Sequence, residues 1–328
     1  MLSIAITHRM KKQAISFTAF VVILLLGCND SDNGLGILEP NPTTTDHLEY
    51  FGFTLVDTLW DDPTDSETKA DYSDEVAPFS NVADILVVFP TDNVTARLQK
   101  MQQLQMNSIL HVAHLFFEIE GSDAPSGTDY TLRTDYQDRW LTFVGANQLA
   151  QNQGGVLAYY LGEEPTWNGI TASELKLAAD FINATTSEGH IMVIEAHPVL
   201  NELQLPSTVD WVGFNHYFIE DPANNPTFLG ELGTLKAKLK ENQQLVMVMD
   251  AHYIEFAHGD FGGIELNNMG EVAKSYYELA KAEAKVVALL GYFWPSGFDQ
   301  PNAIGARHMP DNVKNEYVRI GKEISGKK

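Results

Sequence analysis

The sequence predicts an α/β fold, a (β/α)8 barrel that forms a single domain over residues 47–328. Eight short apolar runs alternate there with stretches of helical periodicity. The runs are almost continuously apolar, as expected for parallel strands that are covered on both faces. Roughly 280 residues suit such a barrel, which typically needs about 250. The predicted strands are 50–56, 85–89, 108–117, 156–161, 190–195, 210–215, 244–249 and 286–294.

The stretches between the runs have the spacing of amphipathic helices. In 270–284 the apolar residues recur on one helical face. Thr171 and Glu174 have the spacing of a capping box, which predicts that a helix begins there. The connection 61–84 is acidic and has room for only a short helix. An open doubly wound sheet is the alternative, but neither a GxGxxG motif nor a P-loop is found. The predicted helices are 93–105, 133–150, 172–185, 227–241, 269–284 and 311–325.

The first 28 residues have the pattern of a signal segment. Three basic residues within 9–12 precede the run 17–26, which is apolar apart from one threonine. Ten residues are too few to cross a bilayer, which needs about 20, but they fit a signal peptide. Gly27 and Cys28 follow, and the pattern resembles the lipobox of bacterial lipoproteins. The resemblance implies cleavage before Cys28 and its lipidation; an ordinary secretory signal is the alternative.

Residues 29–46 are polar and rich in Gly, Pro, Asn and Thr, which predicts a flexible tether. Cys28 is the single cysteine, so the domain beyond it has neither a disulfide nor a thiolate metal site. We therefore expect an exported protein that only a lipid attaches to a bacterial membrane, in the periplasm or at the cell surface. The sequence leaves the oligomeric state open.

Charge excludes some partners. The chain has 44 acidic and 21 basic residues, a formal net charge of −23. Such a surface repels phosphate backbones and anionic lipid headgroups, so we expect no nucleic-acid partner and no basic membrane-binding patch. Neutral substrates, cations or sugars fit better.

Polar and aromatic side chains collect where the predicted strands end, which is the active-site face of such barrels. Carboxyl groups can protonate a glycosidic oxygen and activate a nucleophile, and aromatic rings can stack on sugars. This combination favours carbohydrate chemistry. The residues, in chain order, are Asp57, Trp60, His111, His114, Glu118, Glu163, Glu164, Trp167, Glu195, His197, Asn215, His216, Tyr217, Asp250, His252, Tyr253 and Trp294.

The stretch 159–165, which ends in Gly-Glu-Glu-Pro, resembles the strand-four motif of the clan A glycoside hydrolases. The resemblance implies that Glu164 is the catalytic acid/base, with Glu163 beside it. It also implies that His216 and Tyr217 steady a nucleophile and that Trp294 is an aromatic platform.

The chain departs from the clan at the end of strand seven, where a glutamate nucleophile is expected and Asp250 stands instead. Its shorter side chain sets the carboxylate back by roughly 1.5 Å, about one C–C bond. Asp250 could serve as nucleophile or base, Glu195 could replace it, or catalysis could be lost.

Strand periodicity restricts which side chains share a face. His111 and His114, three residues apart on one predicted strand, should point to opposite faces. The adjacent His216 and Tyr217 should also point in different directions.

The sequence therefore predicts a glycoside hydrolase that needs neither cofactor nor metal. Glu164, Asp250 and Glu163 are its expected catalytic residues. A metal-dependent hydrolase of the amidohydrolase type is one alternative, although strand one offers Asp57 where that class has a His-x-His pair; its ligands would come from His111, Glu195, His197, His216, Asp250 and His252. A non-catalytic glycan-binding lipoprotein is the other. The expected substrate-binding residues are Trp294, Tyr217, His216, Asn215, His114, Trp167 and Asp57.

Overall fold

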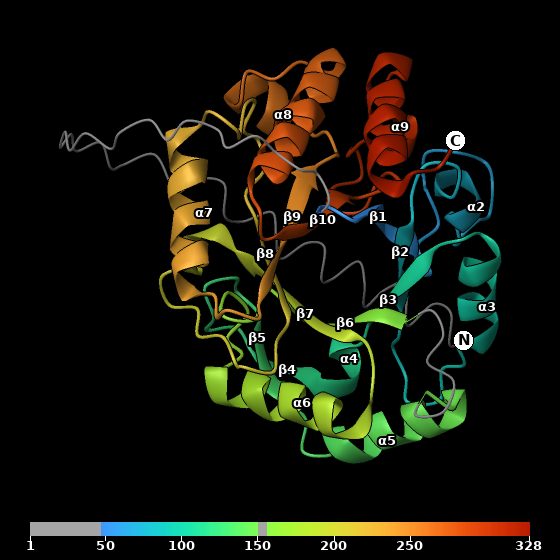
Figure 1. Cartoon of the computed structure of the whole chain (residues 1–328), viewed down its shortest axis with the longest axis vertical. Coiled ribbons are helices and arrows are strands. Elements are labelled where there is room, and N and C mark those ends of the chain that lie inside the picture. Colours follow the sequence, from blue (N-terminus) through green and yellow to red (C-terminus); the bar gives the residue numbers. More distant parts are fainter. Residues whose placement is uncertain (1–46, 150–155) are drawn as a thin grey trace.

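The computed structural model describes residues 47–149 and 156–328. Eight parallel strands close into a barrel in the order β1-β10-β9-β8-β7-β6-β3-β2 (Figure 1). This confirms the predicted (β/α)8 barrel. The expected signal segment with Cys28 and the expected tether lie outside the described residues. The barrel strands are β1 (Tyr50–Asp57), β2 (Val82–Leu86), β3 (Asn107–His111), β6 (Val156–Glu163), β7 (His190–Ala196), β8 (Trp211–Asn215), β9 (Gln244–Asp250) and β10 (Val286–Tyr292).

Helices surround the ring of strands (Figure 1). The helix that begins after Thr171 has the predicted capping box, in which the Thr171 side chain and Glu174 bond to each other's backbone amides. None of the described helices is long and apolar enough to span a membrane. The α-helices are α2 (Ser73–Val76), α3 (Thr95–Gln103), α4 (Ala113–Phe116), α5 (Tyr136–Asn147), α6 (Ala172–Thr185), α7 (Pro226–Lys238), α8 (Met269–Ala282) and α9 (Asp311–Ser325).

The third predicted strand, 108–117, is wrong in its second half. β3 ends at His111, and α4 follows after one residue. The chain then forms an antiparallel hairpin of β4 (Phe117–Gly121) and β5 (Asp129–Leu132). The apolar run continues past β3 because α4 is also buried, so its length says nothing about where the strand stops.

The second strand begins at Val82, three residues before the prediction, and includes the charged residue Asp84. Its carboxylate accepts hydrogen bonds from the amides of Leu55 (2.9 Å) and Val56 (2.8 Å). These amides belong to an irregular part of β1, where the register shifts and Leu55 has a φ of 59°. Asp84 therefore replaces the ladder bonds that the irregularity removes, which is why a buried strand tolerates a carboxylate here.

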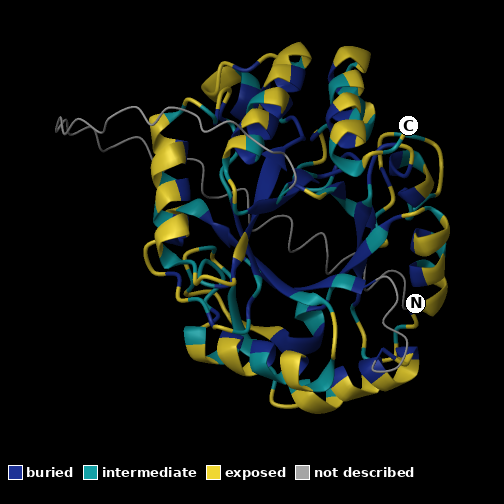
Figure 2. Ribbon diagram, viewed as in Figure 1, coloured by how far each residue is buried: buried dark blue, intermediate teal, exposed yellow. Residues whose placement is uncertain are grey.

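The strands have an inner and an outer apolar face. On β9, Val246 and Val248 belong to the cluster inside the barrel, whereas Leu245 and Met247 pack in the larger cluster with the surrounding helices. Figure 2 shows buried residues along the strands and exposed residues on the outward sides of the helices. Because side chains fill the barrel, chemistry is confined to the loops at its C-terminal rim.

Candidate active site

Glu164 reaches across the rim of the barrel. It follows β6 directly, and its side-chain oxygen Oε1 accepts a 2.7 Å hydrogen bond from Nδ2 of Asn215, the last residue of β8. β7 lies between β6 and β8, so this bond spans the end of a whole strand. The other oxygen, Oε2, is buried and has no hydrogen-bond partner among the described residues. One carboxyl oxygen is thus held in place, and the other is buried with no hydrogen-bond partner among the described residues.

The environment of Glu164 favours its protonated form. Burial and the charge of Glu163 raise its pKa, the bond from Asn215 lowers it, and the result is a pKa of about 8. A carboxyl group with such a pKa carries its proton at neutral pH and can give it to a reacting group.

Glu163 is more open than Glu164, with 41% of its side chain exposed. Its Oε2 lies 3.9 Å from Nε2 of His111. Partial burial and the charges of Asp299 and Asp84 raise its pKa. Glu163 thus adds negative charge beside Glu164 and faces solvent at the same rim.

Three tyrosines and Asp299 complete this rim, and sequence reasoning missed Tyr160, Tyr292 and Asp299. Tyr217 and Tyr292 stack with ring centroids 5.0 Å apart, and Tyr160 stacks on His111 at 4.5 Å. The Tyr292 hydroxyl donates to Oδ1 of Asp299 at 3.0 Å, and burial raises the pKa of Asp299. Tyr160 and Tyr292 lie inside predicted apolar strands, where the sequence does not distinguish them from core residues. Asp299 lies seven residues past the end of β10, beyond the strand ends from which the candidates were taken.

Asp250 ends β9 and is fully buried. Its carboxylate lies 3.1 Å from Nε2 of His258 and 3.1 Å from Nδ1 of His252, and it accepts the Phe218 amide at 2.8 Å. Burial raises its pKa, but the charges of the two histidines hold it well below the usual value. Asp250 is thus an ionised group that holds two loops together, and the two histidines that contact it are buried as well. His258 lies in a helical turn after the strand, so its role was not visible in the sequence.

Glu195 is a second fully buried carboxylate. It accepts hydrogen bonds from the backbone amides of Thr166 (2.8 Å), Trp167 (3.3 Å) and Ala196 (2.9 Å). The first two belong to the turn that follows Glu164, so Glu195 fixes the loop that begins at Glu164. Trp167 is connected to this site through its amide.

The structure does not bring Trp294 and Asp57 to Glu164. The Trp294 indole donates to Glu75 at 2.8 Å, and its ring packs on Phe53 in the cluster between strands and helices. Asp57 is buried and bonded to Nε of Arg97 at 2.6 Å. Both side chains are occupied in the scaffold.

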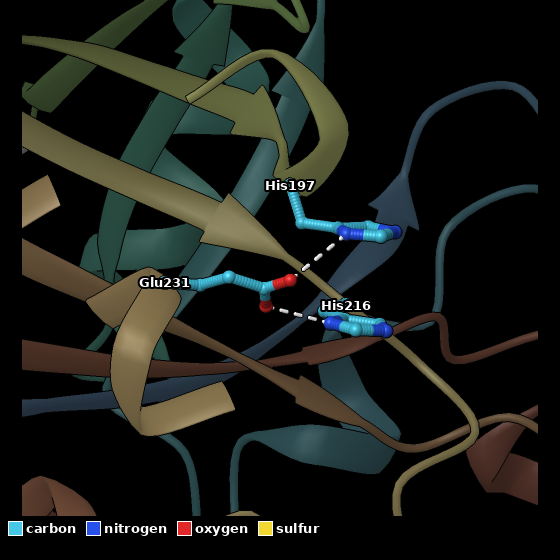
Figure 3. Close-up of side chains that lie close together, drawn as sticks. All are labelled: His197, His216 and Glu231. Carbon is cyan, nitrogen blue, oxygen red and sulfur yellow. Dashed lines mark hydrogen bonds and ion pairs between the residues drawn. The ribbon is translucent and has the colours of Figure 1, made fainter. Parts of the chain in front are cut away.

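Of the two predictions about the directions of histidine side chains, one is wrong and one agrees with the structure. His114 was expected to point away from His111, but this was wrong: it lies on α4, and the two ring centroids are 6.2 Å apart. His216 and Tyr217 do diverge, as expected. Tyr217 packs against Tyr292, whereas His216 bonds to Glu231 of α7 and stacks on His197 (Figure 3).

The six possible ligands of the metal-dependent alternative do not meet in one place. Among the described residues, His197 and His216 group with Glu231, and Asp250 and His252 group with His258. His111 and Glu195 belong to neither group. A site that uses all six is therefore not formed.

Fold and site together define a closed (β/α)8 barrel that carries a buried, protonated carboxyl group on its C-terminal rim. No protein-family model matches the sequence, and no curated protein matches it. Several solved structures do share the fold at 10–11% sequence identity.

A GH113 β-1,4-mannanase has a TM-score of 0.56, and the match covers 84% of this chain and 99% of the mannanase. A GH113 β-mannanase from Alicyclobacillus acidocaldarius has a TM-score of 0.54, with 85% and 99% covered. A GH10 endoxylanase from a sugarcane soil metagenome has 0.50, with 84% and 97% covered. At such identities the likeness is one of fold, so function has to be argued from the site.

The two neighbours of Glu164 should move its pKa in opposite directions. Asn215→Ala removes a donor that favours the ionised form, so the pKa should rise; Glu163→Gln removes a like charge, so it should fall. Side-chain ¹³C NMR titration of each variant, with the Glu164 signal assigned through Glu164→Gln, measures both shifts. Two shifts of the same sign would contradict the described site.

Proposed function

We propose that this protein is a glycoside hydrolase that acts on a polysaccharide or oligosaccharide, with Glu164 as its general acid. The observation that carries the proposal is the buried Oε2, without a hydrogen-bond partner, of a carboxyl group with a pKa of about 8. The solved structures with the same fold include a mannanase and an endoxylanase by name, which supports a carbohydrate substrate.

In the proposed reaction, Glu164 donates its proton to the glycosidic oxygen as the bond from that oxygen to the sugar carbon breaks. The bond from Asn215 fixes the carboxyl group, so that the proton lies on the unpaired oxygen. Glu163 maintains the high pKa of Glu164 through charge repulsion. The tyrosines of the rim offer flat faces and hydroxyl groups to a sugar.

The reaction also needs a carboxylate that attacks the sugar or activates a water molecule. We assign this role to Asp299. Tyr292 holds one of its oxygens, the residue is partly exposed, and its charge acts on both Glu163 and Glu164. Asp250, the residue expected from the sequence, is fully buried, is bonded to His258 and the Phe218 amide, and has His252 3.1 Å away. We assign it the positioning of His252, His258 and Phe218.

Glu164→Gln should lower turnover of the natural polysaccharide by about 10²–10⁴-fold, the usual contribution of a general acid. The loss should be smaller for aryl glycosides, whose leaving group needs no proton. Because the amide cannot ionise in a buried position, the variant should unfold at the same or a higher temperature at neutral pH. Reducing-sugar release and thermal unfolding measure these effects. Glu271→Gln, on the exposed surface of α8, is the matched control, and wild-type turnover by Glu164→Gln would refute the assignment.

The two aspartates should respond differently to truncation. Asp299→Ala should abolish turnover with little change in unfolding temperature, and added azide should restore cleavage of an aryl glycoside by replacing the lost carboxylate. Asp250→Ala leaves two buried histidines without their counter-charge, so it should cost about 3–5 kcal/mol of stability. Rescue by azide in Asp250→Ala instead of Asp299→Ala would return the role to Asp250.

Burial of Asp250 also favours a second candidate function, a glycan-binding protein without catalysis. In that case wild type binds a sugar on a carbohydrate array but releases no product from it. The same array, followed by product analysis, separates the two functions.

We further propose that the protein is exported and attached to a bacterial membrane through lipid on Cys28. This rests on the pattern of residues 1–28. Incorporation of a labelled fatty acid by the wild type, and its loss in Cys28→Ser, tests the proposal.

A further inference from the structure

A pair of stacked histidines lies on the rim next to the proposed acid. His197 follows β7 directly, and His216 follows β8 directly. Their rings are parallel within 3°, with centroids 3.7 Å apart. Asn215, the neighbour of His216 in the chain, is the residue that bonds to Glu164. The pair is thus connected to the acid through a single residue.

Glu231 of α7 determines where the hydrogens of both rings are. Its Oε1 lies 3.1 Å from Nδ1 of His197, and its Oε2 lies 2.6 Å from Nδ1 of His216 (Figure 3). Burial raises the pKa of Glu231, but the two imidazoles bring it down to about 2, so the carboxylate is ionised and can only accept. Each ring therefore carries a hydrogen on Nδ1, and in the neutral ring Nε2 is left as an acceptor.

The two Nε2 atoms are available to a ligand. No hydrogen bond to either Nε2 is formed within the described part of the chain. The side chains of His197 and His216 are 25% and 20% exposed. In Figure 3 both rings extend away from Glu231 in the same direction. The molecule thus presents two parallel acceptors, held by one carboxylate.

Parallel acceptors suit two separate donors better than one metal ion. An ion bound at about 2.0–2.1 Å needs nitrogen lone pairs that converge on one point. The lone pairs of parallel, face-to-face rings run side by side and reach two points instead. Two hydroxyl groups on neighbouring carbons of a sugar ring present two O–H donors side by side. They match the pair in number, in direction and in hydrogen-bonding role.

We infer that His197 and His216 form a sugar-binding subsite that accepts hydrogen bonds from two adjacent hydroxyl groups of one sugar residue. The inference rests on the proposed function insofar as the ligand is a carbohydrate. It adds a specificity: an adjacent hydroxyl pair is required in a sugar unit close to the glycosidic bond whose oxygen Glu164 protonates.

The test compares His197→Phe and His216→Phe, which keep a flat ring and remove the acceptor, with His190→Phe as control. His190 also stacks on an aromatic ring, that of Trp211, but it lies at the start of β7, on the opposite end of the barrel. For an oligosaccharide that the wild type binds, each test variant should raise the Kd, measured by calorimetry, about fivefold. The control should leave it unchanged.

A deoxy analogue of the same oligosaccharide, lacking one of the two hydroxyls, should bind the wild type more weakly and show no further loss with the matching variant. If a phenylalanine variant does not fold, Glu231→Gln replaces it. The amide oxygen can accept from only one ring, and the amide N–H donates to Nδ1 of the other ring. That second ring then carries its hydrogen on Nε2, which can no longer accept a hydrogen bond. Binding should therefore weaken again while the circular dichroism spectrum is retained.

The outcomes separate the subsite from the proposed function. Unchanged Kd values in every variant overturn the subsite, and hydrolysis by the wild type would still stand. Weaker binding by the variants without any hydrolysis by the wild type keeps the subsite and overturns the catalytic proposal. Binding to no sugar overturns both. If a chelator abolishes binding and zinc restores it, the rings hold a metal ion and the hydroxyl assignment is wrong.

Discussion

The hydrogen bond from Asn215 to Glu164 is the interaction on which the site depends. It joins the ends of two strands that are not neighbours, and it can do so only because the barrel is closed and β7 lies between them. The bond holds one carboxyl oxygen and leaves the other buried and unpaired. An unpaired buried oxygen is costly in the ionised state, so the same geometry that orients the group also keeps it protonated.

Two other buried carboxylates hold loops of the rim in place but do not contact Glu164 through a hydrogen bond. Glu195 binds the amides of the turn after Glu164, and Asp250 binds two histidines and the amide of Phe218. Asp250 is held in its ionised form, and Glu195 accepts bonds from three backbone amides. Glu164, in contrast, favours its protonated form and has one oxygen without a hydrogen-bond partner. One barrel rim thus contains a carboxyl group with a raised pKa, Glu164, and one with a lowered pKa, Asp250. Their surroundings, not their residue type, decide which can donate a proton.

The sequence predicted the barrel well, because apolar runs and helical spacing are local patterns that survive in the fold. It failed where the pattern was ambiguous: a buried helix, α4, continued the apolar run of β3, and a carboxylate, Asp84, stood inside β2. For the site, Glu164 and Asn215 could be named as candidates from their strand ends. Asp299, His258 and Glu231 could not, since they lie on loops or a helix that only the tertiary fold brings to the rim. Trp294 could not be distinguished from a core tryptophan because its direction depends on where β10 ends.

The pH dependence of kcat/KM for the wild-type protein tests the central claim most directly. This quantity reports the ionisation of the acid in the free enzyme. A general acid held by Asn215 beside Glu163 predicts that activity persists through neutral pH and falls as a group with a pKa of about 8 loses its proton. A decline governed by a group in the ordinary carboxyl range, with a pKa of about 4.5, would show that Glu164 is ionised at neutral pH and would contradict the account.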